Sequence, residues 1–165
     1  MFDLSGRVAV VTGGNTGIGL GIGRGIGAAG GAVAIWARNQ ERNHQAVTEL
    51  TAEGVRAFSA GCDVTDEDDV ARALDATVEH FGHVDTLFAN AGIMPDSAFI
   101  DMTLAEWRRV LAVNLDGAFL SLRAAARHLV ARGEGGSLVV VSSTAALHGA
   151  PRREHYTTSK AGLVG

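Results

Sequence analysis

Short apolar runs alternate with longer amphipathic stretches along the whole chain. The runs are continuously apolar rather than alternating, which is typical of strands that helices cover on both faces. They lie at Arg7–Thr12, Ala32–Trp36, Val55–Cys62, Asp85–Asn90 and Ser137–Ser142. This pattern predicts a parallel sheet of five strands.

The stretches between these runs have the spacing of helices. We expect helices from the first glycine turn to about Ala29, over Gln40–Glu53, from Thr65 to His80, from Thr103 to about Arg132, and from about Tyr156 onward. Thr65-Asp66-Glu67-Asp68 and Thr103-Leu104-Ala105-Glu106 have the form of capping boxes. Such alternation predicts a doubly wound, Rossmann-like α/β fold. Because no linker, low-complexity segment or repeat interrupts it, we expect residues 1–165 to form a single domain.

The composition argues against several classes of protein. The 165 residues carry 14 basic and 18 acidic side chains, a net charge of −4 without a basic cluster, which argues against nucleic-acid binding. The single Cys62 cannot form an intrachain disulfide, as is typical of a reducing compartment. The sequence shows neither a signal peptide nor an apolar run long enough to cross a membrane. We therefore expect a cytoplasmic protein.

A glycine-rich turn, Thr12-Gly13-Gly14-Asn15-Thr16-Gly17-Ile18-Gly19, joins the first strand to the first helix. Its glycines allow a close approach of the backbone to a ligand, and the following helix N-terminus supplies free N–H groups, so it favours a pyrophosphate site. The alternative is an ordinary loop. Gly25-Ile26-Gly27-Ala28-Ala29-Gly30 has the dinucleotide-binding spacing but lies late in the expected helix and fails the context test. The further glycines of that helix are expected to pack closely on the sheet: Gly21, Gly23, Gly25 and Gly27.

The end of the second strand bears on the choice between NAD and NADP. An acidic residue there would bind the ribose 2′-hydroxyl group of NAD, whereas an arginine accommodates the 2′-phosphate of NADP. The chain reads Ala34-Ile35-Trp36-Ala37-Arg38-Asn39, with no carboxylate and with a guanidinium suited to phosphate. We therefore expect NADP to be preferred, with NAD as the second choice. The alternative is that Arg38 is a surface residue that stacks on adenine.

The only tyrosine and the only lysine of the chain stand four residues apart, at Tyr156 and Lys160. On a helix this spacing places both side chains on one face. A carbonyl that accepts a hydride also needs a proton donor, and a nearby positive charge favours the phenolate form of a phenol. The pair therefore indicates a general acid/base site; the alternative is a solvated helix start with an accidental pairing. The histidines and carboxylates show no metal-ligand spacing.

These motifs together resemble the short-chain dehydrogenase/reductase family. The glycine turn has the form T-G-x-x-x-G-x-G, Asp63-Val64 ends the third strand, Asn90-Ala91-Gly92 follows the fourth, and Tyr156 and Lys160 form Y-x-x-x-K. The family usually has a second asparagine where this chain has Ala89.

The resemblance implies roles for particular residues. Tyr156 would be the general acid/base, Lys160 would act on Tyr156 and hold the nicotinamide ribose, Ser143 would orient the substrate oxygen, and Asn114 would support a proton relay. The coenzyme-binding positions of the family correspond to Gly13, Asn15, Thr16, Gly17, Ile18, Gly19, Arg38, Asn39, Asp63, Val64, Asn90, Ala91, Gly92, Tyr156 and Lys160. His148, His155 and the segment Arg152-Arg153-Glu154 are expected to lie outside the chemistry.

The resemblance also implies an activity. The protein would transfer a hydride between NAD(P)(H) and a secondary alcohol or ketone, such as a sugar, a polyol or a 3-oxoacyl thioester. It would do so as a homo-oligomer, a dimer or a tetramer. A rival interpretation is a dinucleotide-binding module without turnover, a sensor or a subunit, because the segment that shapes the family's substrate pocket would follow Gly165. We expect the natural chain to continue past Gly165, since Ser137–Ser142 would otherwise be an unpaired apolar edge.

Overall fold

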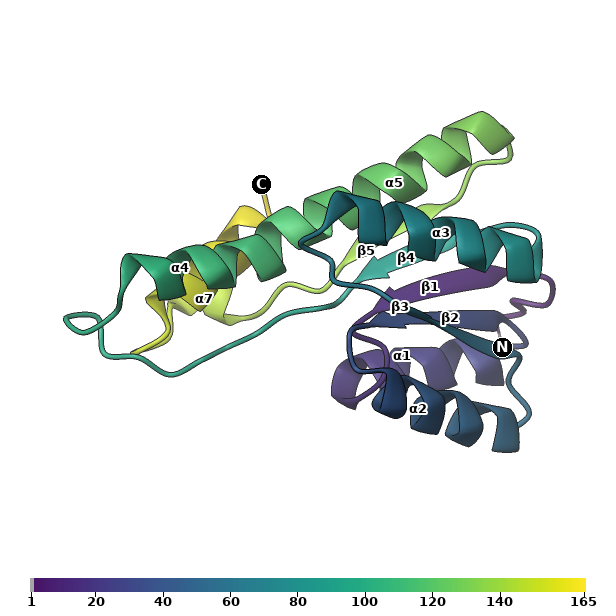
Figure 1. Cartoon of the computed structure of the whole chain (residues 1–165), viewed down its shortest axis with the longest axis horizontal. Coiled ribbons are helices and arrows are strands. Elements are labelled where there is room, and N and C mark those ends of the chain that lie inside the picture. The colour runs from purple at the N-terminus through teal and green to yellow at the C-terminus, as the bar shows by residue number, and fades with distance from the viewer. Residues whose placement is uncertain (1) are drawn as a thin grey trace.

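The sheet has five parallel strands in the order β3-β2-β1-β4-β5 (Figure 1). The computed structural model describes residues 2–165. The strands are β1 (Val8–Thr12), β2 (Ala32–Ala37), β3 (Ala57–Gly61), β4 (Thr86–Ala89) and β5 (Ser137–Val140). Each begins and ends within two residues of the run expected for it. The predicted Rossmann-like sheet is therefore confirmed.

The central strands are buried on both faces, as their continuous apolar runs require. All of β1 and the first five residues of β2 are buried. Val10 pairs with Ala34 of β2 on one side and with Leu87 of β4 on the other. The chain adds β2 and β3 on one side of β1 and then crosses to β4 on the other. The boundary between β1 and β4 is therefore the topological switch point, where such sheets bind ligands.

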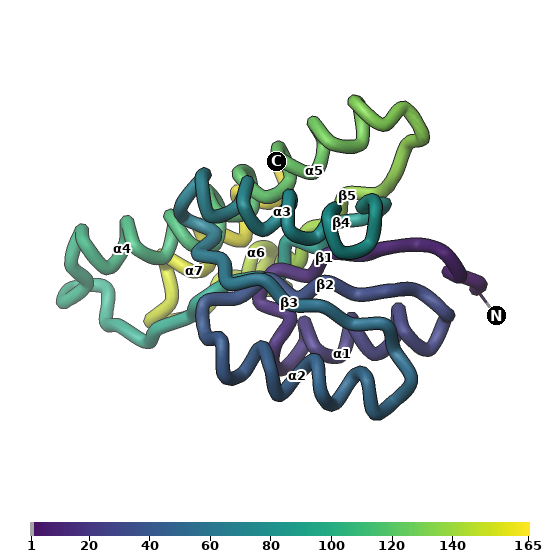
Figure 2. The backbone as a smooth tube through the Cα atoms, turned by 45° about the vertical axis from the view of Figure 1, so that its right-hand side comes forward, coloured from purple at the N-terminus to yellow at the C-terminus, as the bar shows by residue number. Residues whose placement is uncertain are grey.

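Helices cover both faces of the sheet. α1 (Gly17–Ala28) and α2 (Gln40–Ala52) lie on one face, and α3 (Glu67–Phe81) and α5 (Gly117–Arg132) lie on the other, as Figures 1 and 2 show. Each face has its own buried cluster, and alternate residues of the central strands belong to one cluster or the other. This layered arrangement leaves the ends of the strands as the places where a site can form.

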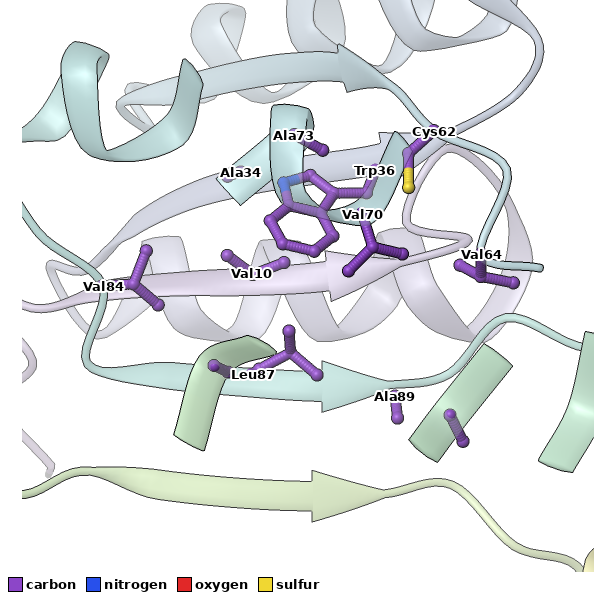
Figure 3. Packing of buried hydrophobic residues seen from close by; sticks show 12 residues of the cluster. Val10, Ala34, Trp36, Cys62, Val64, Val70, Ala73, Val84, Leu87 and Ala89 are labelled. Atoms are coloured by element: carbon purple, nitrogen blue, oxygen red, sulfur yellow. The ribbon is translucent and has the colours of Figure 1, made fainter. Parts of the chain in front are cut away.

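The core on the α3 and α5 face contains Trp36, the largest fully buried side chain (Figure 3). Its indole N–H donates to the hydroxyl of Thr77 at 2.9 Å, and that hydroxyl donates to the carbonyl of Ala73 at 2.7 Å. The buried polar atoms are thus satisfied inside an apolar layer. These bonds fix α3 against β2, and so fix the strand end that Arg38 follows.

The long helix predicted from Thr103 to about Arg132 is not one α-helix. Thr103 caps its start as expected, and α4 (Leu104–Leu111) follows. The chain then forms a π-helical segment, η1 (Ala112–Asp116), before α5 continues to Arg132. A π-helical segment changes the direction of the side chains within it, and such segments are frequent at functional sites. Asn114 lies in this one.

Both predicted capping boxes need correction. The Glu106 carboxylate does not close the box at the start of α4, because it accepts a hydrogen bond from the Ser97 hydroxyl at 3.1 Å instead. The N-cap of α3 is Asp66, not Thr65, since the Asp66 carboxylate accepts two backbone N–H groups of the first turn. The Thr65 hydroxyl donates to Asp63.

The four glycines inside α1 fall into two pairs. A Cβ on Gly27 would lie 2.2 Å from Val55, and one on Gly23 would lie 3.4 Å from a β2 side chain, so this pair packs closely as expected. A Cβ on Gly21 or Gly25 would meet no atom of the described chain within 4 Å, and both positions are exposed. The expectation of close packing is therefore wrong for Gly21 and Gly25.

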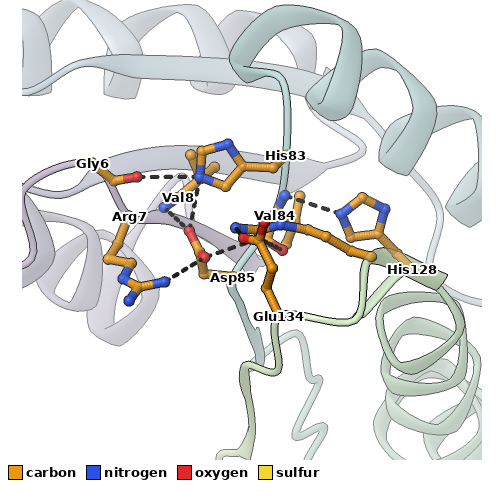
Figure 4. Close-up of polar contacts among 9 residues, drawn as sticks. Gly6, Arg7, Val8, His83, Val84, Asp85, His128 and Glu134 are labelled. Carbon is orange, nitrogen blue, oxygen red and sulfur yellow. Dashed lines mark hydrogen bonds and ion pairs between the residues drawn. The ribbon is translucent and has the colours of Figure 1, made fainter. Parts of the chain in front are cut away.

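Polar side chains meet at the amino edge of the sheet, where β4 begins (Figure 4). The buried Asp85 carboxylate accepts the N–H of Val8 at 2.8 Å and the guanidinium groups of Arg7 and Arg132, each at 3.0 Å. The His83 ring lies 3.1 Å from it. Burial raises the pKa of Asp85, but the Val8 N–H and the two arginines outweigh it and hold that pKa below its ordinary value. The network ties β1, β4 and the end of α5 together.

The last strand, β5, lies on the β4 side of the switch point, and the last two helices follow it along the chain. β5 is an edge strand, and its Leu138 and Val139 are 43% and 36% exposed. The short α6 (Ala145–His148) follows, and then α7 (Glu154–Gly162), which packs against α4. Among residues 2–165, no helix is long and apolar enough to cross a bilayer.

Candidate active site

A cavity of about 770 Å³ lies at the carboxyl edge of the sheet, over the switch point. This volume is typical of ligand pockets. Thirteen of the predicted coenzyme-binding residues line it: Gly13, Asn15, Thr16, Gly17, Ile18, Gly19, Arg38, Asn39, Asp63, Val64, Asn90, Ala91 and Gly92. Six more lining residues were not predicted: Trp36, Ala37, Arg42, Cys62, Ile93 and Val113.

The glycine turn forms one wall of this cavity. Gly13 and Gly17 have φ angles of +63° and +54°, which favour glycine. A Cβ on Gly19 would lie 2.5 Å from the carbonyl oxygen of Gly13, so the turn closes only without a side chain there. Within residues 2–165 the Thr16 side chain caps no N–H group of α1, and the first turn of α1 has no acidic residue. The free N–H groups of this helix end fit an anionic group such as a pyrophosphate.

Asn90 braces the glycine turn from the end of β4. The Thr12 hydroxyl accepts the N–H groups of Asn90 and Ala91, both at 3.0 Å, and the Asn90 amide donates to the Thr12 carbonyl at 2.9 Å. Ala89, which stands where the family has a second asparagine, is buried. These bonds join the ends of β1 and β4 below the cavity.

Two arginines line the cavity where β2 leads into α2. Arg38 is 67% exposed, and its guanidinium lies 3.7 Å from the carboxylate of Asp63. Asn39 caps α2 by accepting the N–H of Arg42 at 2.9 Å. Arg42 was not predicted to bind the coenzyme, because only the residues at the end of the strand were considered. The sequence feature that could have identified it is its position four residues after Arg38, in the first turn of the next helix. Two guanidinium groups beside a helix N-terminus fit a phosphate group.

In the segment after β3, hydrogen bonds from a nearby residue hold the carboxylate of Asp63 in place. The N–H and hydroxyl of Thr65 donate to Asp63 at 3.0 and 2.8 Å, and the Asp63 N–H donates to Asp69 at 3.0 Å. Burial, together with the charges of Asp69 and Asp63, raises the pKa of the neighbouring Cys62 to about 12. The thiol therefore stays protonated at neutral pH and is a poor nucleophile.

Tyr156 and Lys160 lie close together on α7. The Lys160 ammonium is 5.8 Å from the centre of the Tyr156 ring and donates to the carbonyl of Val141 at 2.6 Å. Lys160 is only 4% exposed, and burial lowers its pKa. The positive charge thus lies beside the phenol in a partly dry environment, where it acts more strongly than in water.

The residues after β5 anchor this helix. The Ser142 hydroxyl donates to the carbonyl of Lys160 at 2.8 Å. The Ser143 hydroxyl accepts the N–H of Ala145 at 3.2 Å, a bond that uses an oxygen lone pair and leaves the hydroxyl proton available to a ligand. Ser142 therefore has a structural contact, while the hydroxyl proton of Ser143 has no acceptor among residues 2–165.

Asn114 is fully buried in η1 and holds two other segments. Its side chain accepts the N–H of Ile93 at 2.8 Å, donates to the carbonyl of Ile93 at 3.0 Å, and donates to the hydroxyl of Ser159 at 2.9 Å. A Cβ on Gly92 would lie 3.3 Å from the Asn114 side-chain oxygen and 3.7 Å from the Lys160 ammonium. Gly92 lines the cavity, so Asn114 and Lys160 lie directly behind its wall.

The structure does not place all predicted site residues in the cavity lining. Asn114, Ser143, Tyr156 and Lys160 lie outside it, and of these Asn114 and Lys160 lie behind Gly92. A further residue, His155, was expected to lie outside the chemistry, yet its ring accepts the backbone N–H of Tyr156 at 2.8 Å. Periodicity cannot reveal this contact, because it joins a side chain to the backbone of the next residue.

Comparisons with known proteins bear on the family and the fold of the chain. A family model described as short chain dehydrogenase matches residues 7–165. The chain is 41% identical over 161 residues to the L-rhamnose 1-dehydrogenase (NAD(P)(+)) of Sphingomonas sp. (strain SKA58), covering 97% of this chain and 63% of that protein.

Two solved structures show the same fold. A short-chain type dehydrogenase/reductase from Mycobacterium marinum is 37% identical with a TM-score of 0.95, covering 99% of this chain and 67% of that one. An NAD⁺-bound xylitol dehydrogenase is 34% identical with a TM-score of 0.93, covering 98% and 62%. The chain spans about 63% of the length of the curated relatives it matches.

Proposed function

The chain belongs to the short-chain dehydrogenase family, and we propose that it is an oxidoreductase that transfers a hydride between NAD(P)(H) and a secondary alcohol or its ketone. The observation that carries this proposal is the position of Lys160, with Tyr156 beside it, behind Gly92 at the wall of a cavity that fits a dinucleotide. Because the two buried clusters lie on opposite faces of one sheet, we propose that the chain is a single domain.

The residues of the cavity suit a nicotinamide dinucleotide, which supplies or accepts the hydride when it is bound. The N–H groups at the start of α1 would hold the pyrophosphate. Arg38, Asn39 and Arg42 would hold a 2′-phosphate, so we propose that NADP is preferred. The named relatives include NAD(P)(+) and NAD⁺ proteins, so this preference rests on the three residues of this chain.

The proton would move at the Tyr156 hydroxyl. During reduction the phenol donates its proton to the substrate carbonyl oxygen, and during oxidation the phenolate accepts the alcohol proton. The Lys160 charge favours the phenolate, and the free proton of the Ser143 hydroxyl would bond to the same substrate oxygen and stabilise its developing charge. Asn114 would support a proton relay from η1 while its side chain fixes α7.

A sugar or a polyol is the substrate class that we propose. The relative from Sphingomonas is named for L-rhamnose, and one matching structure is named for xylitol. A 3-oxoacyl thioester is the competing class. A panel of aldoses, polyols and 3-oxoacyl thioesters, assayed by absorbance of the reduced coenzyme, separates the two.

Replacing Tyr156 by phenylalanine tests the proposal. In Tyr156→Phe we expect kcat to fall by about a hundredfold or more, since the proton donor is lost. The Kd for NADP should stay nearly unchanged, as measured by fluorescence titration. Thr157→Val, in the same turn of the helix, is the matched control and should keep its activity.

Two outcomes would contradict the proposal. If Tyr156→Phe kept more than a few per cent of the activity, the acid/base role would be wrong. If the unaltered protein bound NADP but turned over no alcohol or ketone in the panel, the rival function as a binding module would be favoured.

A further inference from the structure

His155 is fully buried where α7 packs on α4. Its Nδ1 accepts the backbone N–H of Tyr156 at 2.8 Å. That N–H belongs to the first turn of α7, and the first N–H groups of a helix have no acceptor within the helix. Arg153, the N-cap residue, supplies no side-chain acceptor within the described chain. The imidazole of His155 therefore caps the turn that carries Tyr156.

The same contact fixes the proton of the neutral ring. Because Nδ1 accepts a hydrogen bond, the hydrogen of the neutral imidazole is on Nε2. Nε2 is buried with no hydrogen-bond partner among residues 2–165, and it faces the Glu106 carboxylate at 3.9 Å. A buried donor without an acceptor is costly, and an apolar side chain would avoid that cost. What the imidazole adds over an apolar side chain is the acceptor at Nδ1.

Glu106 is itself held in place on the far side of the ring. Its other carboxylate oxygen accepts the Ser97 hydroxyl at 3.1 Å, and the N–H of Ser97 donates to the carbonyl of Arg152 at 3.0 Å. These contacts join α4 to the loops before α4 and α7. The carboxylate therefore faces the ring edge from a fixed direction, and its charge favours the orientation with the hydrogen on Nε2.

We propose that His155 is a positioning residue for Tyr156, with its Nδ1 fixing the first turn of α7 and Glu106 fixing the ring. This inference rests on the proposed function, in which the Tyr156 hydroxyl transfers the proton. A catalytic group must be held within about 0.5 Å of its working position, and a frayed first turn would not hold it there. Since the phenol acts in the chemical step, its misplacement lowers kcat more than it raises KM.

Two variants separate the hydrogen bond from the volume of the ring. His155→Asn keeps an acceptor, because the amide oxygen of asparagine occupies the place of Nδ1, but it loses much of the buried volume. His155→Phe keeps the volume and loses the acceptor. If His155 only fills space, His155→Phe should be affected less than His155→Asn. If His155 positions Tyr156 through its acceptor, His155→Asn should be affected less than His155→Phe.

The first measurement needs no coenzyme. Tyr156 is the only tyrosine of these 165 residues, so ¹⁵N-tyrosine labelling gives them one amide signal, which Tyr156→Phe removes. In His155→Phe we expect hydrogen exchange of this amide to speed up by about tenfold or more. In His155→Asn it should stay within about threefold of the unaltered protein. Equal exchange in the unaltered protein and His155→Phe would overturn the proposal.

The second measurement is steady-state kinetics of the holoenzyme. We expect kcat to fall by about tenfold or more in His155→Phe, with KM and the Kd for NADP within about twofold, and kcat to recover in His155→Asn. Thr157→Val is the control for a change in the same turn. Equal losses of kcat in the two His155 variants would overturn the positioning role. An unaltered protein without turnover would contradict the proposed function alone, because the exchange comparison would still decide whether His155 holds the Tyr156 amide.

Discussion

Among single residues, Asp85 couples folding to pH. Its lowered pKa means that the carboxylate stabilises the fold fully above the pKa of the unfolded chain, whose ordinary value is 3.8. That stabilisation is lost as the pH falls through the folded pKa. We expect Asp85→Asn to lower the free energy of unfolding at pH 7 by about 2 kcal/mol, because charged hydrogen bonds to Arg7 and Arg132 are lost. Urea unfolding from pH 7 to pH 2 measures this.

The control for Asp85 is the exposed Asp75 on α3. Asp75→Asn should leave stability at pH 7 within about 0.5 kcal/mol, as is usual for surface substitutions. Below about pH 4 the difference between Asp85→Asn and the unaltered protein should shrink, because the unfolded chain takes up a proton at Asp85 at a higher pH than the folded protein does. A difference that stayed constant with pH would contradict the role of the charge.

The preference between NADP and NAD also depends on single residues. We expect Arg38→Ala and Arg42→Ala each to weaken NADP binding by about tenfold while changing NAD binding by less than about twofold, because only NADP carries the 2′-phosphate. Titration of both coenzymes measures this. Arg127→Ala, at an exposed position of α5, removes the same charge away from the cavity and is the control. An equal loss for NAD and NADP would show that these arginines stack or pack instead.

Residue roles could be predicted where spacing along one element brings groups together. Tyr156 and Lys160 were found because four residues make one turn of a helix. Arg42 and His155 were missed for different reasons. Arg42 reaches the cavity only because α2 begins at Gln40, two residues after Arg38, and the His155 contact depends on a ring rotamer and on packing against Glu106. Neither rotamers nor packing between helices can be deduced from a hydrophobic pattern.

At the scale of the element, we expect alanine substitutions of the α1 glycines to have opposite effects on stability. Gly21→Ala and Gly25→Ala should each raise the free energy of unfolding by about 0.5–1 kcal/mol, since alanine suits an open helical position better than glycine. Gly27→Ala should lower it by about 1–3 kcal/mol, because its methyl group would overlap Val55. Thermal and urea unfolding of the three variants measures the difference, and each serves as the control for the others. Destabilisation in all three would mean that α1 tolerates no side chain on its outer face.

The strands and the longer helices were predictable to within a few residues, but the short α6 and the irregularities within the helices were not. The cap at Thr103 could be predicted because it depends on residues three positions apart. The π-helical segment could not, since the apolar spacing through Ala112–Asp116 fits an ordinary α-helix. The one local sign was Asn114, an unfavourable residue in the middle of a helix. Its side chain bonds to Ile93, in the segment between β4 and α4, and to Ser159 of α7.

For the whole molecule, the parallel topology explains why so much of the cavity could be predicted. Carboxyl ends of parallel strands meet at one edge, so Thr12 and Asn90, 78 residues apart, become neighbours once the strand order is known. The positions of α4 and α7 follow no such rule. They lie beyond the sheet edge and are set by contacts such as Ser97 to Glu106 and Ser142 to Lys160.

Association between copies of the chain is the last prediction, and it concerns the outer face of α4 and α5. Leu104 and Phe119 are 60% and 56% exposed there, and the Arg123 guanidinium lies 4.8 Å from the Phe119 ring. Two exposed apolar side chains on successive helices, one of them with a cation beside it, are the observation on which this prediction rests. We expect the protein to be a dimer or a tetramer, and Phe119→Glu to shift the mass measured by light scattering toward the monomer. Burying this carboxylate in an interface carries a desolvation cost that the neighbouring Arg123 offsets only in part, and so would oppose association. Phe2→Glu, at an exposed aromatic residue near the amino edge of the sheet, should leave the mass unchanged. If Phe119→Glu kept both the unaltered mass and the unaltered circular dichroism, the interface would have to lie elsewhere.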